Sequence, residues 1–505
     1  MRYCEAHGEG FEEDDGSGGD AFQKRSIVLT SLVWGPYSLG PESATSHFLV
    51  CGATGSGKTT LIDVLMRTAF EAFSNDRRAL VYDAKQEVIP KLRALGLEDR
   101  IRILHPFHAD ANPWNMAEDI DDPLSARQLA QTLISDSSGR RDGDSSFFDE
   151  ACRDIVSIVV QSLSLCCTKS QWTFRDLLLA LLYPENTKIL LERDRTREGK
   201  PFPAPMRVWR CYLDPETTDE RTRGNIRASL NAKLAVYEPV AAAWQQTKQP
   251  SFSLKRWQKG NEILVLGNDE AARAAIDPIN RALFQRASEL TLARTEGTGS
   301  QTWFLLDEIR ETGRLPALNP LLLKGRSKGA CVVLSFQDVE GLREVYGTHL
   351  ANEIVANCNN IALLRTNSAA TAEWAAASFG KFLVVDHDKT TGIAGTDASS
   401  SKTAKLVERP AVMSGELLYL RPPSPEDGLT GYFRDARARS DEPKRFTIDW
   451  AELEAARLPT TGASHLDIDR TDLILLPWDD EDLRRLGLDK PRPEQIPAPT
   501  LRPRG

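Results

Sequence analysis

Short apolar runs bounded by turn residues recur along the chain and predict a set of buried strands. Each run is four to six residues long and lacks the regular polar alternation of a strand with one wet face. Such runs are typical of strands that are covered on both faces, as in parallel sheets flanked by helices. The runs cover residues 47–51, 79–82, 101–104, 263–266, 303–306, 331–336 and 361–364.

A helical pattern lies between the first two predicted strands. Leu61, Leu65, Ala69 and Phe73 recur at every fourth position and form one apolar face over residues 59–73. A helix with such a face packs on a sheet. The order strand, helix, strand predicts parallel βαβ units, so we expect an α/β fold with a mainly parallel sheet.

Between about residues 115 and 260 strand signals are few and helical signals are frequent. One apolar helical face is formed by Phe148, Ala151, Ile155, Val159 and Leu163. Thr173 and Asp176 have the spacing of a capping box at a helix start. A further helical pattern covers residues 221–246. We therefore expect an inserted all-α domain over residues 116–260, flanked by the two parts of a nucleotide-binding domain, 26–115 and 261–450.

The two ends differ from the rest in composition. Residues 1–25 are acidic and rich in glycine, which predicts a disordered tail. Residues 451–505 hold 11 acidic and eight basic residues and end in a proline-rich stretch. That composition favours an extended, solvated tail. Within it, a short helix or a docking peptide stays open for residues 473–488, although a solvated end is favoured there as well.

Overall composition places the chain among water-soluble folded proteins. Of the 505 residues, 41% are hydrophobic and 27% are charged, and the net charge is −9. An acidic total excludes a protein that coats nucleic acid with its whole surface, but a narrow basic channel stays open. The longest apolar run, residues 155–167, is interrupted by serines and a glutamine and predicts a buried helix rather than a membrane span.

The first predicted strand is followed by the pattern G-x-x-x-x-G-K-[ST]. A strand before this pattern and a helix after it are the context that a phosphate-binding loop requires. Glycines let backbone N–H groups turn toward phosphate oxygens, and the helix start adds partial positive charge. Lys58 is predicted to hold the β- and γ-phosphates of ATP, and Thr59 a Mg²⁺ ion. We assign the cradle to Gly52, Ala53, Thr54, Gly55, Ser56, Gly57, Lys58, Thr59 and Thr60.

Two later strands end in polar side chains that complete such a site. Asp307 and Glu308 follow the strand at 303–306; we expect Asp307 to hold the Mg²⁺ and Glu308 to activate the attacking water. Gln337 follows the strand at 331–336 and fits a γ-phosphate sensor. Arg326, in a basic loop before that strand, has two candidate roles: an arginine finger for a neighbouring subunit, or a contact with nucleic-acid phosphates.

Together these segments resemble the TraD/TrwB family of type IV coupling proteins, the DNA-pumping ATPases of bacterial conjugation. The resemblance spans roughly residues 45–435. Besides the phosphate-binding loop, it rests on residues 82–85 (YDAK), 104–107 (LHPF) with 114–115 (WN), 305–308 (LLDE), 315–326 and 337–347.

The resemblance implies a RecA-like P-loop NTPase domain with an inserted all-α domain, assembled as a homo-hexameric ring. It implies ATP-driven movement of DNA, favouring single strands, together with a relaxase or another secretion substrate. It also carries the catalytic roles over to Lys58, Glu308, Gln337 and Arg326, with Arg326 as a finger acting in trans.

Family members usually begin with a transmembrane region, and this sequence offers none. We therefore expect a cytoplasmic protein that contacts the inner membrane only through a partner protein of the secretion channel. Two alternatives stay open. One is a soluble DNA motor like FtsK or HerA, active in DNA processing or defence; the other is a nucleotide-binding platform that recruits secretion substrates without pumping.

Overall fold

The computed structural model describes residues 31–71, 77–135, 143–167, 171–193, 203–297, 299–394, 397–437, 443–459 and 468–489. The expectation for residues 1–25 therefore lies outside the described residues. The chain divides into two compact units. The first comprises Met1–Glu98 and Thr291–Gly462, and the second comprises Asp99–Leu290 and Ala463–Gly505.

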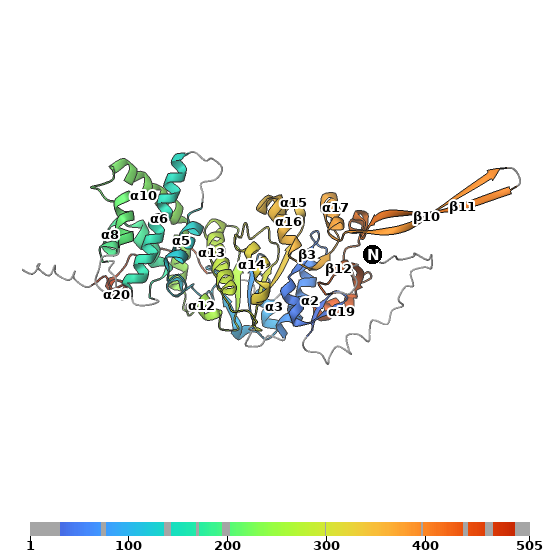
Figure 1. Ribbon diagram of the computed structural model, residues 1–505. Helices are drawn as coiled ribbons and strands as arrows, with labels where there is room; N and C mark the ends of the chain where they lie inside the picture. Colours follow the sequence, from blue (N-terminus) through green and yellow to red (C-terminus); the bar gives the residue numbers. More distant parts are fainter. Residues whose placement is uncertain are drawn as a thin grey trace, which may run out of the picture. The chain divides into compact units, whose positions relative to one another are not determined.

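The first unit is built on a large, mostly parallel sheet (Figure 1). Its strands lie in the order β13-β12-β9-β3-β8-β7-β4. The pairs β3/β8, β3/β9, β7/β8 and β4/β7 are parallel, and β12 pairs antiparallel with both β9 and β13. The strands are β3 (Phe48–Cys51), β4 (Arg77–Asp83), β7 (Gln301–Leu306), β8 (Ala330–Phe336), β9 (Asn360–Leu363), β12 (Leu429–Arg434) and β13 (Lys444–Ile448).

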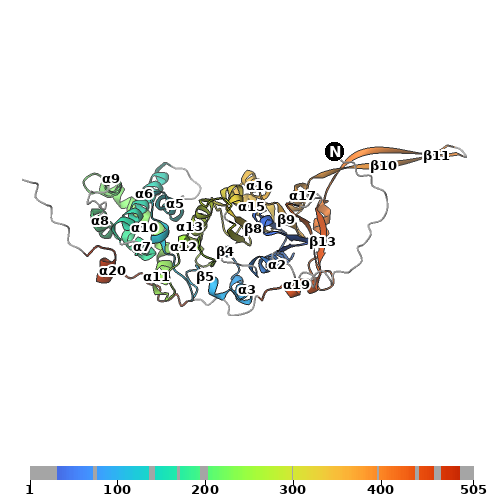
Figure 2. The same cartoon turned by 60° about the horizontal axis from the view of Figure 1, so that its bottom comes forward.

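Helices cover both faces of this sheet, which explains why its strands are continuous apolar runs. In both views α2, α3 and α19 lie on one face, and α15 and α16 lie on the other (Figures 1 and 2). The core around the start of β3 is aromatic. The ring centroid of Phe48 lies 5.0 Å from that of Trp34 and 6.0 Å from that of Trp303. The helices are η2 (Pro41–Ser46), α2 (Lys58–Glu71), α3 (Val88–Ala94), α14 (Leu318–Lys324), η5 (Arg326–Lys328), α15 (Val339–Tyr346), α16 (Thr348–Ala356), α17 (Ala369–Ser378), α18 (Ser414–Tyr419) and α19 (Trp450–Ala456).

Six described strands of the first unit were not predicted: β12 and β13, which extend the large sheet, and the strands of two separate antiparallel hairpins. One pairs β1 (Leu32–Trp34) with β2 (Tyr37–Leu39). The other pairs β10 (Lys381–Ala394) with β11 (Asp397–Pro410) and projects away from the sheet (Figure 2). Polar and apolar residues are mixed along β10 and β11. The strand β10 has one four-residue apolar run, at residues 382–385 (FLVV), and β11 has none, so the sequence offers a strand signal only at the start of this hairpin, and the predicted strands do not include it.

The second unit is mainly helical and includes a pair of parallel strands. These strands are β5 (Ile101–Ile103), which η3 (Glu98–Arg100) precedes, and β6 (Ile263–Gly267). Its longest helix, α6, packs against α5, α7, α8, α9 and α10 and buries Ala151, Ile155, Val159 and Leu163. The helices are α4 (Met116–Asp119), α5 (Pro123–Leu133), α6 (Gly143–Cys166), α7 (Phe174–Leu182), α8 (Pro184–Arg193), α9 (Pro203–Tyr212), α10 (Glu220–Leu234), η4 (Ala235–Tyr237), α11 (Glu238–Gln246), α12 (Leu254–Trp257), α13 (Arg273–Leu292) and α20 (Asp480–Arg485).

The sequence patterns located these elements well. All seven predicted strands are present, as β3 to β9, and the predicted helix at 59–73 is α2. The capping box at Thr173 and Asp176 opens α7 as expected.

The part of the chain after residue 450 differs from the extended, solvated tail that we expected. Within the first unit α19 packs against α2 and buries Leu453. Within the second unit the chain around α20 is docked, and it buries Leu486 and Leu488. For the described residues 450–459 and 468–489 the prediction of a solvated tail was wrong, and the alternative of a short helix within 473–488 agrees with α20, because average composition does not register a few apolar and charged anchors in a polar segment.

Candidate nucleotide site

The phosphate-binding loop joins β3 to α2 at the carboxyl edge of the sheet. Gly55 and Gly57 adopt left-handed backbone angles, φ of +75° and +93°. A Cβ atom on Gly57 would lie 1.9 Å from Leu429 Cδ1, whereas around Gly55 there is open space. Glycine is therefore required at 57 for steric reasons, and at 55 it leaves the backbone accessible to a ligand. The predicted cradle residues, 52–60, form this loop and the first turn of α2.

The side chain of Lys58 is folded back over its own loop. Its Nζ donates to the carbonyl oxygens of Gly52 at 2.7 Å and Ala53 at 3.3 Å. Burial lowers the pKa of the Lys58 ammonium, and the nearby carboxylates of Glu308 and Asp307 oppose that shift. The buried hydroxyl of Ser56 has no hydrogen-bond partner among the described residues. An ammonium group and an unpartnered buried donor beside an open glycine loop fit a bound phosphate chain.

Thr59 and Asp307 face each other across the edge of the sheet. Thr59 Oγ1 lies 3.5 Å from Asp307 Oδ2, although the two residues come from α2 and the end of β7. The ammonium of Lys85, after β4, lies 3.3 Å from Thr59 Oγ1 and 3.9 Å from Asp307 Oδ2. A hydroxyl and a carboxylate are hard oxygen ligands, and a positive charge is already placed beside them. The donor set fits Mg²⁺.

The backbone of Glu308 is strained and is held in place by the next strand. Its φ is +62°, a left-handed angle that is uncommon for a residue other than glycine. The N–H of Glu308 donates to Ser335 Oγ at 3.1 Å, and the Ser335 hydroxyl donates to Asp307 Oδ1 at 2.6 Å. Ser335 is fully buried in β8. One serine thus fixes both acidic residues at the end of β7.

Gln337 links the acidic pair to the phosphate-binding loop. Its Oε1 accepts a hydrogen bond from Thr54 Oγ1 at 2.9 Å. Burial raises the pKa of Glu308, and a hydrogen bond from Gln337 and the charge of Lys58 oppose that shift. A buried carboxylate with a raised pKa is suited to accept a proton from water.

Arg326 lies apart from these residues in its own chain. It belongs to η5, which precedes β8, whereas Gln337 follows the same strand. Because β3 and β8 are parallel, the phosphate-binding loop and Arg326 are at opposite edges of the sheet. Arg326 lines an open hollow of about 660 Å³ together with Glu42, Lys324, Lys328 and Arg437. The structure does not bring Arg326 to the phosphate-binding loop of the same chain.

Two residues of the site were not assigned a role from the sequence. Ser335 carries a detectable signal, because it is a polar residue inside an otherwise apolar strand next to the Asp-Glu strand. Lys85 belongs to a segment that supported the resemblance, but its position between Thr59 and Asp307 depends on where β4 ends. The remaining assigned residues, from β3, α2, β7 and β8, meet within this one site.

No helix in the described ranges is both long enough and apolar enough to cross a membrane.

Comparisons with known proteins agree with this arrangement. The family model "type IV secretion-system coupling protein DNA-binding domain" matches residues 32–434. The coupling protein TraD of Escherichia coli (strain K12) is 24% identical over 346 residues, which is 67% of this chain and 44% of TraD. The conjugal transfer protein TraG of Agrobacterium fabrum is 29% identical over 153 residues, 30% of this chain and 22% of TraG. These alignments cover less than half of either relative.

Solved structures show the same fold. The plasmid coupling protein TrwB in complex with ADP and Mg²⁺ superposes with a TM-score of 0.63 at 18% identity, over 90% of this chain and 96% of that chain. VirB4 of Thermoanaerobacter pseudethanolicus superposes with a TM-score of 0.51 at 12% identity, over 85% and 98% of the two chains. Since the family model covers most of the sequence, this chain belongs to the family of type IV secretion-system coupling proteins of the TraD/TrwB type.

Proposed function

We propose that the chain is an ATPase that moves DNA, with single strands favoured, into a type IV secretion system during conjugation. The observation that carries the proposal is the meeting of Lys58, Thr59, Asp307 and Glu308 at one edge of the sheet, in a chain of the coupling-protein family. TrwB has been solved with ADP and Mg²⁺ and with an ATP analogue, which supports ATP and Mg²⁺ as the ligands of this site.

Each residue has a defined task in hydrolysis. Lys58 exchanges its bonds to the carbonyls of Gly52 and Ala53 for the β- and γ-phosphate oxygens. Thr59 and Asp307 would hold Mg²⁺, which neutralises charge on the phosphate oxygens when bound. The Glu308 carboxylate orients the attacking water and takes its proton. Gln337 is hydrogen-bonded to both Thr54 and Glu308, so it connects the phosphate-binding loop to the base. A γ-phosphate bound at the loop would change the position of Gln337 and thereby that of Glu308.

Arg326 is proposed to act on a neighbouring subunit. Its position away from the phosphate-binding loop of its own chain supports a role in trans, as in a ring whose interfaces place one subunit's arginine at the next subunit's nucleotide. The guanidinium fork bridges phosphate oxygens and stabilises charge in the transition state. This assignment requires an oligomer, and we propose a homo-hexamer by analogy with the family.

The partners follow from the same family membership. We propose DNA, a relaxase or another secretion substrate, and a channel protein through which a cytoplasmic ring contacts the inner membrane. TraD is named a coupling protein and TraG a conjugal transfer protein, and both names support this pathway.

The proposal is tested by ATP hydrolysis of the purified chain with single-stranded or double-stranded DNA. We expect stimulation by DNA, larger for single strands, and no hydrolysis by Lys58→Ala. Arg326→Ala should hydrolyse slowly alone and recover when mixed with Lys58→Ala subunits, which supply intact Arg326. Absence of DNA stimulation at every Mg²⁺ and salt concentration contradicts the motor, and absence of recovery contradicts the trans role. A larger response to double strands favours an FtsK- or HerA-like motor.

A recruitment platform without pumping is the second candidate. It predicts that Glu308→Gln, which keeps the shape of the site but removes the base, leaves DNA transfer between cells unchanged. The proposed motor predicts that the same substitution stops transfer while nucleotide binding persists.

A further inference from the structure

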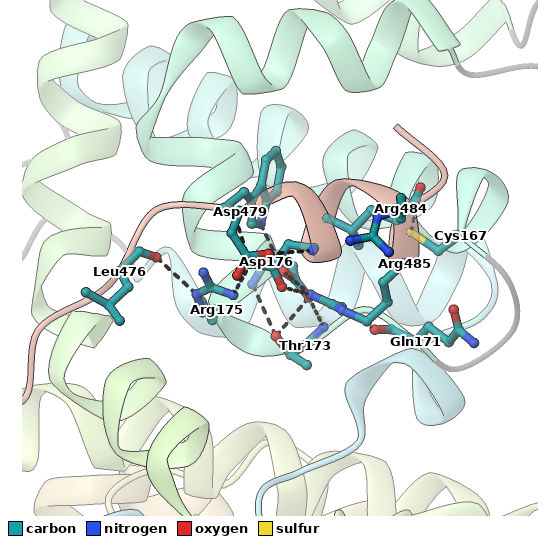
Figure 3. Close-up of polar contacts among 12 residues, drawn as sticks. Cys167, Gln171, Thr173, Arg175, Asp176, Leu476, Asp479, Arg484 and Arg485 are labelled. Carbon is teal, nitrogen blue, oxygen red and sulfur yellow. Dashed lines mark hydrogen bonds and ion pairs between the residues drawn. The ribbon is translucent and has the colours of Figure 1, made fainter. Parts of the chain in front are cut away.

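The start of α7 in the second unit forms a receptor for the C-terminal segment, residues 468–489 (Figure 3). Arg175 and Asp176, side by side in the first turn, are both buried. Arg175 donates to the carbonyl oxygens of Leu476 at 3.0 Å and Pro477 at 2.6 Å, and to Asp482 Oδ2 at 2.8 Å. Among the described residues, every hydrogen bond of the Arg175 guanidinium goes to the C-terminal segment.

Asp176 is the second half of this receptor. It caps α7 through Thr173, and its carboxylate also accepts from Trp478 Nε1 at 2.9 Å and from both terminal nitrogens of Arg485, at 2.7 and 3.0 Å. Its side chain is fully buried. A buried carboxylate is costly unless it is paired, and here the opposite charge comes from a residue 309 positions away. The site is therefore built around the C-terminal segment.

The C-terminal segment contacts its receptor through a few anchor residues, as a bound peptide does. Most of its side chains are exposed, and Ile474 and Leu476 remain 65% and 55% accessible. Two of the anchors, Asp482 and Arg485, lie one turn apart on α20, whereas Trp478 precedes the extended N-cap residue Asp479 and the buried Leu486 follows the helix. The segment therefore contacts its receptor through extended chain and through one short helix.

The bound segment leaves part of its receptor unfilled. A cavity of about 320 Å³ lies beside α20 and is lined by Arg175, Asp482 and Arg485 together with Trp172 and Trp244. The indole N–H groups of Trp172 and Trp244 are buried and have no hydrogen-bond partner in the described ranges. Each buried donor without an acceptor carries the free-energy cost of a missing hydrogen bond. The resident segment supplies no acceptor to either indole and leaves the cavity beside it unfilled.

We propose that the start of α7 is an exchangeable peptide-docking site: residues 476–488 occupy it in cis, and a peptide of a second protein with the same tryptophan, aspartate and arginine spacing takes their place. All of these contacts lie in the second unit, whereas the phosphate-binding loop belongs to the first.

The test uses the full-length chain and a fluorescent peptide of residues 471–489. The wild-type chain should bind this peptide weakly, because its own segment occupies the site. The Trp478→Phe/Arg485→Ala double variant weakens the resident segment and leaves the receptor intact. We expect it to bind the peptide at least tenfold more tightly, since the variant segment loses charge-assisted hydrogen bonds of Trp478 and Arg485 to carboxylates. Fluorescence anisotropy measures the difference.

Matched controls separate docking from general damage. Arg484 is adjacent to Arg485, but among the described residues its side chain donates only to the carbonyl oxygen of Asp480 in its own helix, so Arg484→Ala in the chain should leave peptide binding at the wild-type level. The same two substitutions are also made in the fluorescent peptide. The peptide with Arg485→Ala should bind the double-variant chain at least tenfold more weakly than the peptide with Arg484→Ala. Asp176→Asn, which keeps the volume of the cap, should remove binding when it is added to the double variant.

Two results would overturn the proposal. One is equal binding of the wild-type peptide by the wild-type chain and the double variant. The other is co-purification of two differently tagged copies that depends on Arg485, because the occupant would then be the segment of a neighbouring copy.

Discussion

Ser335→Ala is the substitution that tests the geometry of the nucleotide site most directly. The serine hydroxyl donates to Asp307 at 2.6 Å and accepts the N–H of Glu308 at 3.1 Å. Alanine removes both bonds, leaves the N–H of a strained residue without this acceptor, and changes neither acidic side chain. The volume change is one oxygen atom, so packing in β8 is preserved.

The magnitude follows from the two lost bonds. A hydrogen bond to a charged group contributes about 1.5–3 kcal/mol, and a buried N–H left unsatisfied costs about 1–3 kcal/mol. If only the bond to Asp307 matters, the transition state is destabilised by about 1.5–3 kcal/mol, and hydrolysis slows by about 10- to 150-fold. Asp307 also becomes a less rigid ligand, so half-maximal activity should require more Mg²⁺.

The assay is steady-state ATP hydrolysis over a Mg²⁺ titration, with Ser288→Ala as the matched control. Ser288 is also fully buried, but its hydroxyl has no hydrogen-bond partner in the part of the chain that the structure describes. The control should hydrolyse ATP as the wild type does. Equal rates and equal Mg²⁺ dependence for the two variants would refute the claim that Ser335 positions the acids.

Three further predictions concern the base, the support of α2 and the phosphate-binding loop. Since burial raises the pKa of Glu308 and the base must be ionised, kcat at saturating ATP should fall as pH falls through that raised value; a flat acid limb contradicts the base role. Lys91 and Asp63 form a buried ion pair at 2.9 Å, so Lys91→Met should lower the free energy of unfolding in urea by about 3–5 kcal/mol, and Asp63→Leu added to it should restore most of the loss. Gly57→Ala should abolish nucleotide binding, whereas Gly96→Ala, also at positive φ but in open space, should not.

The loop and the two acidic residues are predictable from the sequence because their geometry is local or follows from parallel strands. A phosphate-binding loop is fixed by neighbouring residues, and Asp307, Glu308 and Gln337 lie near it because parallel strands end at one edge. The role of Ser335 is less accessible, since it depends on the register that places Leu334 opposite Leu306. For the C-terminal segment, a docking peptide at residues 473–488 was among the open alternatives, but its receptor was not predictable, because the sequence shows Asp176 only as part of a helix cap, 309 positions from Arg485.

The strained backbone of Glu308 indicates which parts of the site are set before a nucleotide arrives. A left-handed angle at a residue other than glycine costs about 1–3 kcal/mol and persists only where neighbouring contacts enforce it. Here the enforcing contact comes from Ser335 on the adjacent strand, whose hydroxyl accepts the N–H of Glu308, so the fold itself orients this residue. Lys58 differs, because its ammonium is bonded to carbonyls of its own loop and must leave them to reach a phosphate. Nucleotide binding is thus expected to rearrange the lysine and leave the acids in place, which is the order that an ATPase with a preorganised base requires.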